Sequence, residues 1–274
     1  MNMLTQEYFL MQVKNFKISE LKVLVGRQRL KFNINEISYY LYQIYLASIN
    51  HCHFIDLYDK DDQYEYRYNN YMKNLVLFSK LCVKIFIKHK EENNIKLDKV
   101  NALDSTILET KEAKSITKKD FASNSVTVRK KNKLSPYICG KKLFVFINSK
   151  KQIYHAEMTN INFSDFNYLK DIERIRKHVD NTLLVDRGFS SELVRSRINR
   201  YCSLISPYKK KQKKTLTLEE KSLYKQRWNI EKVFSTLKNK LGKFKLNLYG
   251  KYSLNLKKAK VYATLINYNQ SILS

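Results

Sequence analysis

The chain has 274 residues, of which 43% are apolar and 13% aromatic, so it can bury a sizeable core and global disorder is not expected. Lysine and arginine number 52 against 25 aspartate and glutamate residues, which gives a formal net charge of +27. This excess predicts a polyanionic partner: first DNA or RNA, because each neutralised phosphate releases counterions, and second an anionic membrane surface. Lysine, asparagine, isoleucine and tyrosine abound, which indicates an AT-rich genome whose codon bias contributes to the charge.

We expect neither a secretion signal nor a membrane span in this chain. The most apolar stretch, residues 74–90, is interrupted by Lys80 and Lys84, so it is too polar to cross a bilayer. The sequence therefore predicts a cytoplasmic protein without a membrane partner. The cysteines lie far apart and form no C-x-x-C pair, which predicts free thiols. They are Cys52, Cys82, Cys139 and Cys202.

Residues 1–95 are predicted to form a small α-helical region. Apolar residues recur at steps of three and four over residues 34–49 and 71–87, as in amphipathic helices. Between these helices, we interpret the acidic and aromatic segment 56–68 as a solvated loop in preference to a metal site. The segment 88–99 is highly charged and nearly free of apolar residues, so we place a domain boundary within it.

Residues 96–274 are predicted to form an α/β domain, because short apolar runs alternate with amphipathic helices. The run TLLV is typical of a strand that is buried within a parallel sheet. The expected strands cover residues 100–107, 142–147, 153–158, 182–185 and 203–205. The expected helices cover residues 165–179, 191–200, which Ser190 would cap, and 218–241.

Two aspartates lie in or directly after these strands. Asp186 follows the 182–185 strand and precedes an Arg-Gly turn, so its carboxylate is expected at the carboxyl edge of the sheet, where ligand sites gather. Asp104 lies within the first expected strand. An acid that ends a strand is more often a turn or cap residue than a catalyst, and position alone leaves both interpretations open.

The last expected helix carries a row of polar side chains beside its apolar face. At 100° per residue, Tyr224, Arg227, Glu231 and Lys238 fall within a stripe about 60° wide. The adjoining apolar stripe, in which we include Trp228, is expected to pack in the core. The polar row fits either a salt-bridged helix flank or a catalytic row, and periodicity alone favours the flank.

The polar row resembles a motif of a known family. Its residues reproduce the spacing Tyr-x2-Arg-x3-Glu-x6-Lys of the DDE transposases of the insertion-sequence-four-like superfamily, which bacterial mobile elements encode. Asp104 in LDST resembles the first aspartate of that family. Asp186 in LLVDRGFSS resembles the second, although Arg187 and Phe189 replace the commoner lysine and tyrosine. The resemblance covers roughly residues 98–270.

The resemblance implies an RNase H-like mixed sheet flanked by helices and preceded by the α-helical region. It implies that the catalytic acids Asp104, Asp186 and Glu231 meet at the edge of this sheet. Their carboxylates would bind Mg²⁺ or Mn²⁺, and two such ions would support phosphoryl transfer on DNA. The other members of the row, Tyr224, Arg227 and Lys238, would contact DNA phosphates.

The function that this resemblance implies is that of a transposase in an AT-rich bacterium. The enzyme would cut double-stranded DNA at the terminal inverted repeats of its element and join the freed 3′ hydroxyl to target DNA. Residues 1–95 would bind the DNA ends or form a homodimer that pairs them. The alternatives are an inactive or domesticated transposase that only binds DNA, and an RNase H-like nuclease unrelated to transposition. The basic run 209–214 is equally consistent with a DNA contact and with a solvated loop.

Overall fold

The computed structural model describes residues 3–16, 20–21, 33–49, 75–111, 116, 118, 126–128, 137–208, 214–240 and 253–273. The chain divides into two compact units. We call Met1–Asn93 together with Leu237–Ser274 the helical unit, and Asn94–Thr236 the sheet unit. The acidic segment 56–68 and most of the basic run 209–214 lie outside the described residues. The predicted functional boundary between residues 95 and 96 stays a prediction.

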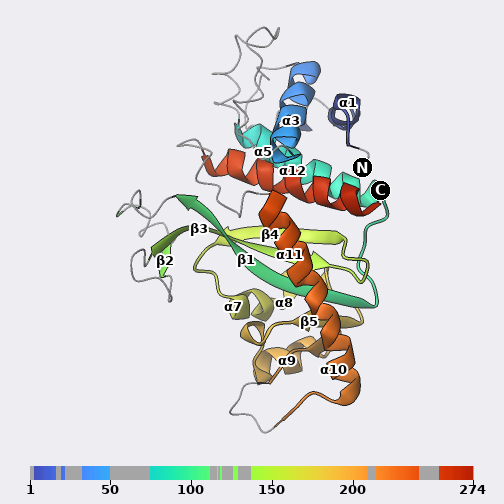
Figure 1. Ribbon diagram of the computed structural model, residues 1–274, viewed down its shortest axis with the longest axis vertical. Helices are drawn as coiled ribbons and strands as arrows, with labels where there is room; N and C mark the ends of the chain where they lie inside the picture. The colour runs from blue at the N-terminus through green and yellow to red at the C-terminus, as the bar shows by residue number, and fades with distance from the viewer. Residues whose placement is uncertain are drawn as a thin grey trace. The chain divides into compact units, whose positions relative to one another are not determined.

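The helical unit contains four described helices, which Figure 1 labels. They are α1 (Gln6–Lys14), α3 (Ile34–Ile49), α5 (Leu75–Glu92) and α12 (Ser253–Leu273). α12 packs on α3 and α5, and α1 packs on α3. Aromatic side chains fill the space between them: Tyr40 and Phe78 are both fully buried, with ring centroids 5.7 Å apart. None of the described helices combines the length and apolar character that a bilayer span needs.

A polar cluster joins α1 to the end of α5. The hydroxyl of Tyr8 donates to Glu92 Oε2 at 3.3 Å, and Gln12 Nε2 donates to Glu92 Oε1 at 2.6 Å. The Tyr8 hydroxyl also lies 3.5 Å from Nδ1 of the fully buried His89. Burial lowers the pKa of His89 to about 4, although the charge of Glu92 opposes this shift. His89 is therefore neutral at pH 7.

The sheet unit is built on a mixed sheet, in which six strands are described. They are β1 (Val100–Lys111), β2 (Val126–Val128), β3 (Tyr137–Ile147), β4 (Ile153–Asn160), β5 (Thr182–Val185) and β6 (Ser203–Ile205). The strand order is β2-β3-β1-β5-β6, with β4 also paired to β3. β3 is antiparallel to β1, β2 and β4, whereas β1-β5 and β5-β6 are parallel. This arrangement confirms the RNase H-like α/β fold.

Short helices cover the sheet where the sequence predicted longer ones. The expected 165–179 helix divides into α7 (Asp165–Lys170) and α8 (Ile172–Arg176), because Asp171 leaves helical geometry with ψ 85° and caps α8. The next helix is α9 (Glu192–Ile198). Ser191, and not Ser190 as predicted, caps it by accepting a hydrogen bond from the Val194 amide at 3.3 Å. The Ser190 hydroxyl instead donates to Ser206 Oγ at 2.8 Å.

The expected 218–241 helix has a change of winding in its middle. It consists of α10 (Leu218–Tyr224), the 3₁₀ turn η5 (Lys225–Arg227) and α11 (Trp228–Lys240). Ile230 and Val233, which belong to the apolar stripe predicted to pack in the core, are buried. Trp228 was predicted to lie in the core, and this prediction is wrong: the side chain is 61% exposed at the start of α11.

Candidate active site

Asp104 lies at the point where the parallel part of the sheet ends. Leu103 of β1 is the last residue of this strand that pairs with β5, and its partner is Val185, the last residue of β5. Asp104 and Asp186 are therefore the next residues along two neighbouring parallel strands. Since the carboxyl ends of parallel strands meet at one edge, the sheet brings these two carboxylates to the same place.

Two hydrogen bonds hold the backbone of Asp186 in place, and its carboxylate does not cap the turn that follows. The residue precedes the 3₁₀ turn η4 (Arg187–Phe189) with ψ 160°, and its side chain makes no hydrogen bond to the turn. Its carbonyl oxygen accepts from the Phe189 amide at 3.0 Å and from Ser206 Oγ at 3.3 Å. The carboxylate of Asp186 is therefore available to a ligand, on a backbone that two contacts hold in place.

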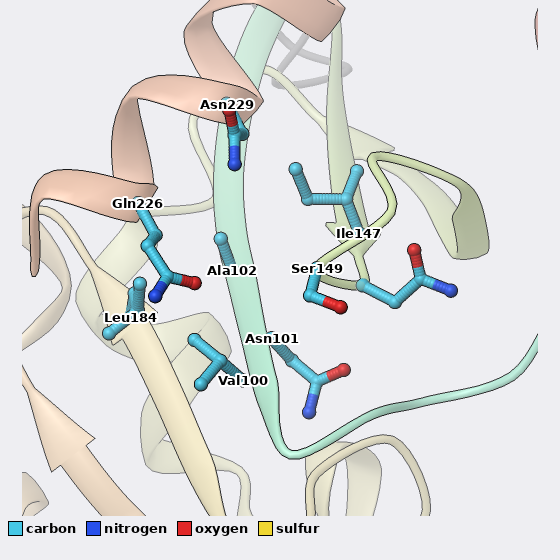
Figure 2. Close-up of a pocket in the computed structure, with 9 residues that line it drawn as sticks. Val100, Asn101, Ala102, Ile147, Ser149, Leu184, Gln226 and Asn229 are labelled. Carbon is cyan, nitrogen blue, oxygen red and sulfur yellow. The ribbon is translucent and has the colours of Figure 1, made fainter. Parts of the chain in front are cut away.

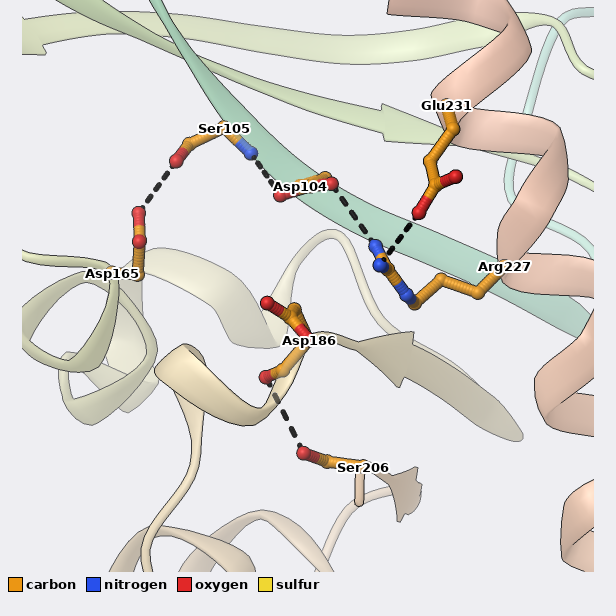
Figure 3. Close-up of polar contacts among 7 residues, drawn as sticks. All are labelled: Asp104, Ser105, Asp165, Asp186, Ser206, Arg227 and Glu231. Atoms are coloured by element: carbon orange, nitrogen blue, oxygen red, sulfur yellow. Dashed lines mark hydrogen bonds and ion pairs between the residues drawn. The ribbon is translucent and has the colours of Figure 1, made fainter. Parts of the chain in front are cut away.

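Arg227 joins two of the predicted acids. Its Nη1 donates to Asp104 Oδ2 at 3.1 Å, and its Nη2 donates to Glu231 Oε1 at 2.8 Å (Figure 3). The Arg227 side chain is 14% exposed, whereas that of Glu231 is 40% exposed, so these contacts are only partly shielded from solvent. The guanidinium carbon also lies 5.8 Å from the centre of the Tyr224 ring. We use the name acid site for the group Asp104, Asp186, Tyr224, Arg227 and Glu231.

The carboxylates of the acid site repel one another. Burial raises the pKa of Asp104, and the charges of Asp186 and Asp165 raise it further, against the Ser105 amide and Arg227, which lower it. Burial also raises the pKa of Tyr224, with a smaller contribution from Asp186. The acid site holds three carboxylates, Asp104, Asp186 and Glu231, and one guanidinium, so its acidic groups outnumber its basic one. Such a site favours binding of a further cation.

Comparison with known proteins decides the family. The family model described as "Transposase DDE domain" matches residues 96–269, which is well over half of the chain. The chain belongs to the transposase DDE domain family. Searches of curated proteins and of solved structures found no match.

Membership of this family confirms the sequence prediction of a DDE transposase. A transposase domain acts on the DNA of a mobile element, and domains of this family generally use divalent metal ions. The assignment to the insertion-sequence-four-like superfamily stays a prediction, as do the catalytic roles of individual residues.

The donor chemistry of this transposase domain fits a hard divalent cation. Carboxylate oxygens from neighbouring residues are the ligands that Mg²⁺ and Mn²⁺ prefer. Among the described residues, however, no three His, Cys, Asp or Glu side chains are grouped closely enough to hold a metal ion. The guanidinium of Arg227 lies between the carboxylates of Asp104 and Glu231 and contacts both.

Lys238 is the one member of the predicted polar row that does not belong to the sheet unit. It lies on α11 beyond Thr236 and is exposed. The structure therefore brings together Tyr224, Arg227 and Glu231 of the row. The contact of Lys238 with a DNA phosphate stays a prediction.

Sequence reasoning missed the residues that support the two aspartates. Asp165 accepts a hydrogen bond from Ser105, the neighbour of Asp104, and Ser206 contacts the backbone of Asp186. The partners are 60 and 20 positions apart in the sequence, so no local pattern links them. The one available signal was the serine directly after Asp104 in LDST.

A small pocket in the transposase domain lies beside the acid site without including it. Gln226 and Asn229, which flank Arg227, reach it from η5 and α11 (Figure 2). The acids are not among its lining residues, so we assign it no part in catalysis. The lining consists of Val100, Asn101, Ala102, Ile147, Asn148, Ser149, Leu184, Gln226 and Asn229.

Proposed function

We propose that the chain is a DNA transposase of an insertion-sequence-four-like element, with Asp104, Asp186 and Glu231 as its catalytic acids. It cuts double-stranded DNA at the terminal inverted repeats of the element and joins the freed 3′ hydroxyl to target DNA. One observation carries the proposal: Arg227 links Asp104 to Glu231, at the sheet edge where Asp186 also emerges. The residues of the predicted motif thereby meet the residue predicted to be the first aspartate.

The three acids would hold two Mg²⁺ or Mn²⁺ ions in the working enzyme. Ions held there would activate the attacking oxygen and stabilise the leaving oxygen of an in-line phosphoryl transfer. The chain contributes rigidity: Asp104 lies on a strand paired with β3, and the Asp186 backbone is fixed by Phe189 and Ser206. Fixed carboxylates reduce the reorganisation that ion binding would otherwise require.

The polar row supplies the contacts to DNA. A guanidinium can hold two phosphate oxygens at once, so Arg227 is suited to grip a phosphate beside the cut when cations take over its role between the carboxylates. Tyr224, whose raised pKa keeps its hydroxyl protonated, can donate a hydrogen bond to a terminal phosphate. Lys238 adds a point charge. Residues 1–95 bind the DNA ends or form the homodimer that pairs them.

A gel assay of strand cleavage and joining tests this function. Purified protein is incubated with the DNA that flanks its gene, in Mg²⁺, Mn²⁺ or EDTA. We expect metal-dependent 3′-end cleavage and joining, and we expect Glu231→Gln to lose both by at least about 1000-fold while still binding DNA, since it removes a ligand and no phosphate contact.

Glu192→Gln is the matched control, because Glu192 is an exposed glutamate in the first turn of another helix of the same unit. Cleavage by Glu231→Gln at the wild-type rate would refute the site. Tight, salt-sensitive DNA binding by the wild type without cleavage in any metal would instead support the inactive, DNA-binding alternative.

A further inference from the structure

Ser105, Asp165 and Lys142 form a partly buried polar cluster on the face of the sheet opposite Arg227. Consecutive residues of a strand point to opposite faces, so Ser105 points away from the face that Asp104 shares with Arg227. The Ser105 hydroxyl donates a hydrogen bond of 2.6 Å to Asp165 Oδ1 (Figure 3). Lys142 of β3 donates to the same oxygen at 3.1 Å. Asp165 is thus joined to two neighbouring strands.

Asp165 also faces the turn that follows Asp186. A Cβ atom added at Gly188 would lie 3.9 Å from Asp165 Oδ2, which is an ordinary contact distance. The helix that carries Asp165, α7, packs on this turn, η4. One carboxylate therefore touches the strand of Asp104 through Oδ1 and faces the turn of Asp186 through Oδ2.

The helix α7 holds this carboxylate firmly. Tyr168 is fully buried, and its ring stacks on that of Phe144 with 3.8 Å between centroids and 8° between planes. Ser164 caps the helix by accepting from the Asn167 amide at 3.0 Å, so capping does not require the Asp165 side chain. The core thus sets the position of Asp165, and its carboxylate is used for contacts across the sheet.

We propose that Asp165, held by Ser105 and Lys142, is a positioning residue that sets the separation of the Asp104 and Asp186 carboxylates. The inference rests on the proposed function, because it concerns the residues expected to bind the metal ions. Asp104 and Asp186 directly follow the last paired residues of β1 and β5, so the ladder between these two strands ends where the two carboxylates begin. Asp165 adds a connection on the other face of the sheet, beyond the end of this ladder.

Metal affinity tests the proposal. Outer-shell partners of ligating carboxylates typically contribute 10- to 100-fold to metal affinity. We therefore expect Asp165→Asn in the full chain to weaken Mn²⁺ binding roughly 10-fold, measured by electron paramagnetic resonance of free Mn²⁺. The metal concentration needed for half-maximal DNA cleavage should rise by a similar factor. The midpoint of thermal unfolding in EDTA should stay within about 2 °C of the wild type.

Matched variants separate positioning from general damage. Asp171→Asn replaces another aspartate at a helix start, which accepts from the Arg174 amide away from the acid site, and it should bind Mn²⁺ as the wild type does. Lys142→Met should weaken binding in the same direction as Asp165→Asn. Lys141→Met is its control, because Lys141 is the adjacent lysine on β3 and contacts Asn160 instead.

Two outcomes would overturn the inference and are distinguishable. If Asp104→Asn weakens Mn²⁺ binding but Asp165→Asn does not, the acid site stands and the positioning role falls. If the wild type and Asp104→Asn bind Mn²⁺ equally, the proposed metal site falls, and the inference falls with it. Weaker Mn²⁺ binding in Asp165→Asn at unchanged thermal stability supports the positioning role.

Discussion

One cluster in each unit buries an ionisable group, and the two clusters do so in opposite ways. In the helical unit, the buried His89 is neutral, and the charged member of its cluster, Glu92, is exposed and accepts two hydrogen bonds. In the sheet unit, Asp104 is partly buried and repelled by other carboxylates, so its pKa is raised. The first arrangement avoids the free-energy cost of a buried charge, and the second accepts it. Accepted costs of this kind cluster at functional sites, which supports the assignment of the acid site.

Within the sheet unit, removing Arg227 should have the largest effect on stability. Arg227→Ala leaves Asp104 and Glu231 without their shared cation, and we expect a loss of about 2 kcal/mol in the free energy of unfolding in EDTA, since the pair is only partly shielded. Mg²⁺ should stabilise this variant more than the wild type. Urea denaturation followed by circular dichroism measures both effects.

Arg197→Ala is the control for this experiment, because Arg197 is an exposed arginine of α9. Equal stability of Arg227→Ala and the wild type in EDTA would show that the carboxylates do not depend on Arg227. The repulsion described for the sheet unit would then be wrong.

Lowering the pH should destabilise the helical unit, because it protonates the buried His89. The unfolded chain takes up a proton on His89 near pH 6.5, whereas the folded protein does so only near pH 4. The stability that neutral His89 contributes is complete above about pH 6.5 and is lost as the pH falls towards 4, by roughly 3 kcal/mol. Urea denaturation between pH 7 and 4 should show this loss, and His89→Gln should lack it. An identical pH dependence in both proteins would contradict the burial effect.

Asp104→Asn should change the free energy of unfolding least, and it should raise it where the other changes lower it. A raised pKa in the folded protein means that the stability contributed by Asp104 is present at low pH and is lost as the pH rises through that pKa. Removing the charge should therefore stabilise the sheet unit slightly at pH 7 without divalent ions, while abolishing cleavage. The gain should disappear in acid. A variant less stable than the wild type at pH 7 would show that Arg227 outweighs the repulsion.

Local patterns predicted most strands of the sheet unit but not the limits of its helices. Thr182–Val185 and Ser203–Ile205 match the predicted strands, because an apolar run bounded by turn residues is a local signal. The break at Asp171 and the cap at Ser191 were missed, since neighbouring residues of similar propensity compete for these positions. Trp228 was misplaced because its apolar character was given more weight than its position: at 100° per residue it lies about 160° around the helix from Ile230, outside the apolar stripe.

The sequence by itself determined the fold class, the transposase family and the spacing of the polar row, because each depends on residues that are close together or follow a fixed motif. Only the tertiary structure decided which groups meet. Arg227 contacts Asp104 across 123 positions, and Asp165 contacts Ser105 across 60. Such contacts depend on strand register and on which face each helix covers. These are set by packing of the whole core, and no local pattern in the chain encodes them.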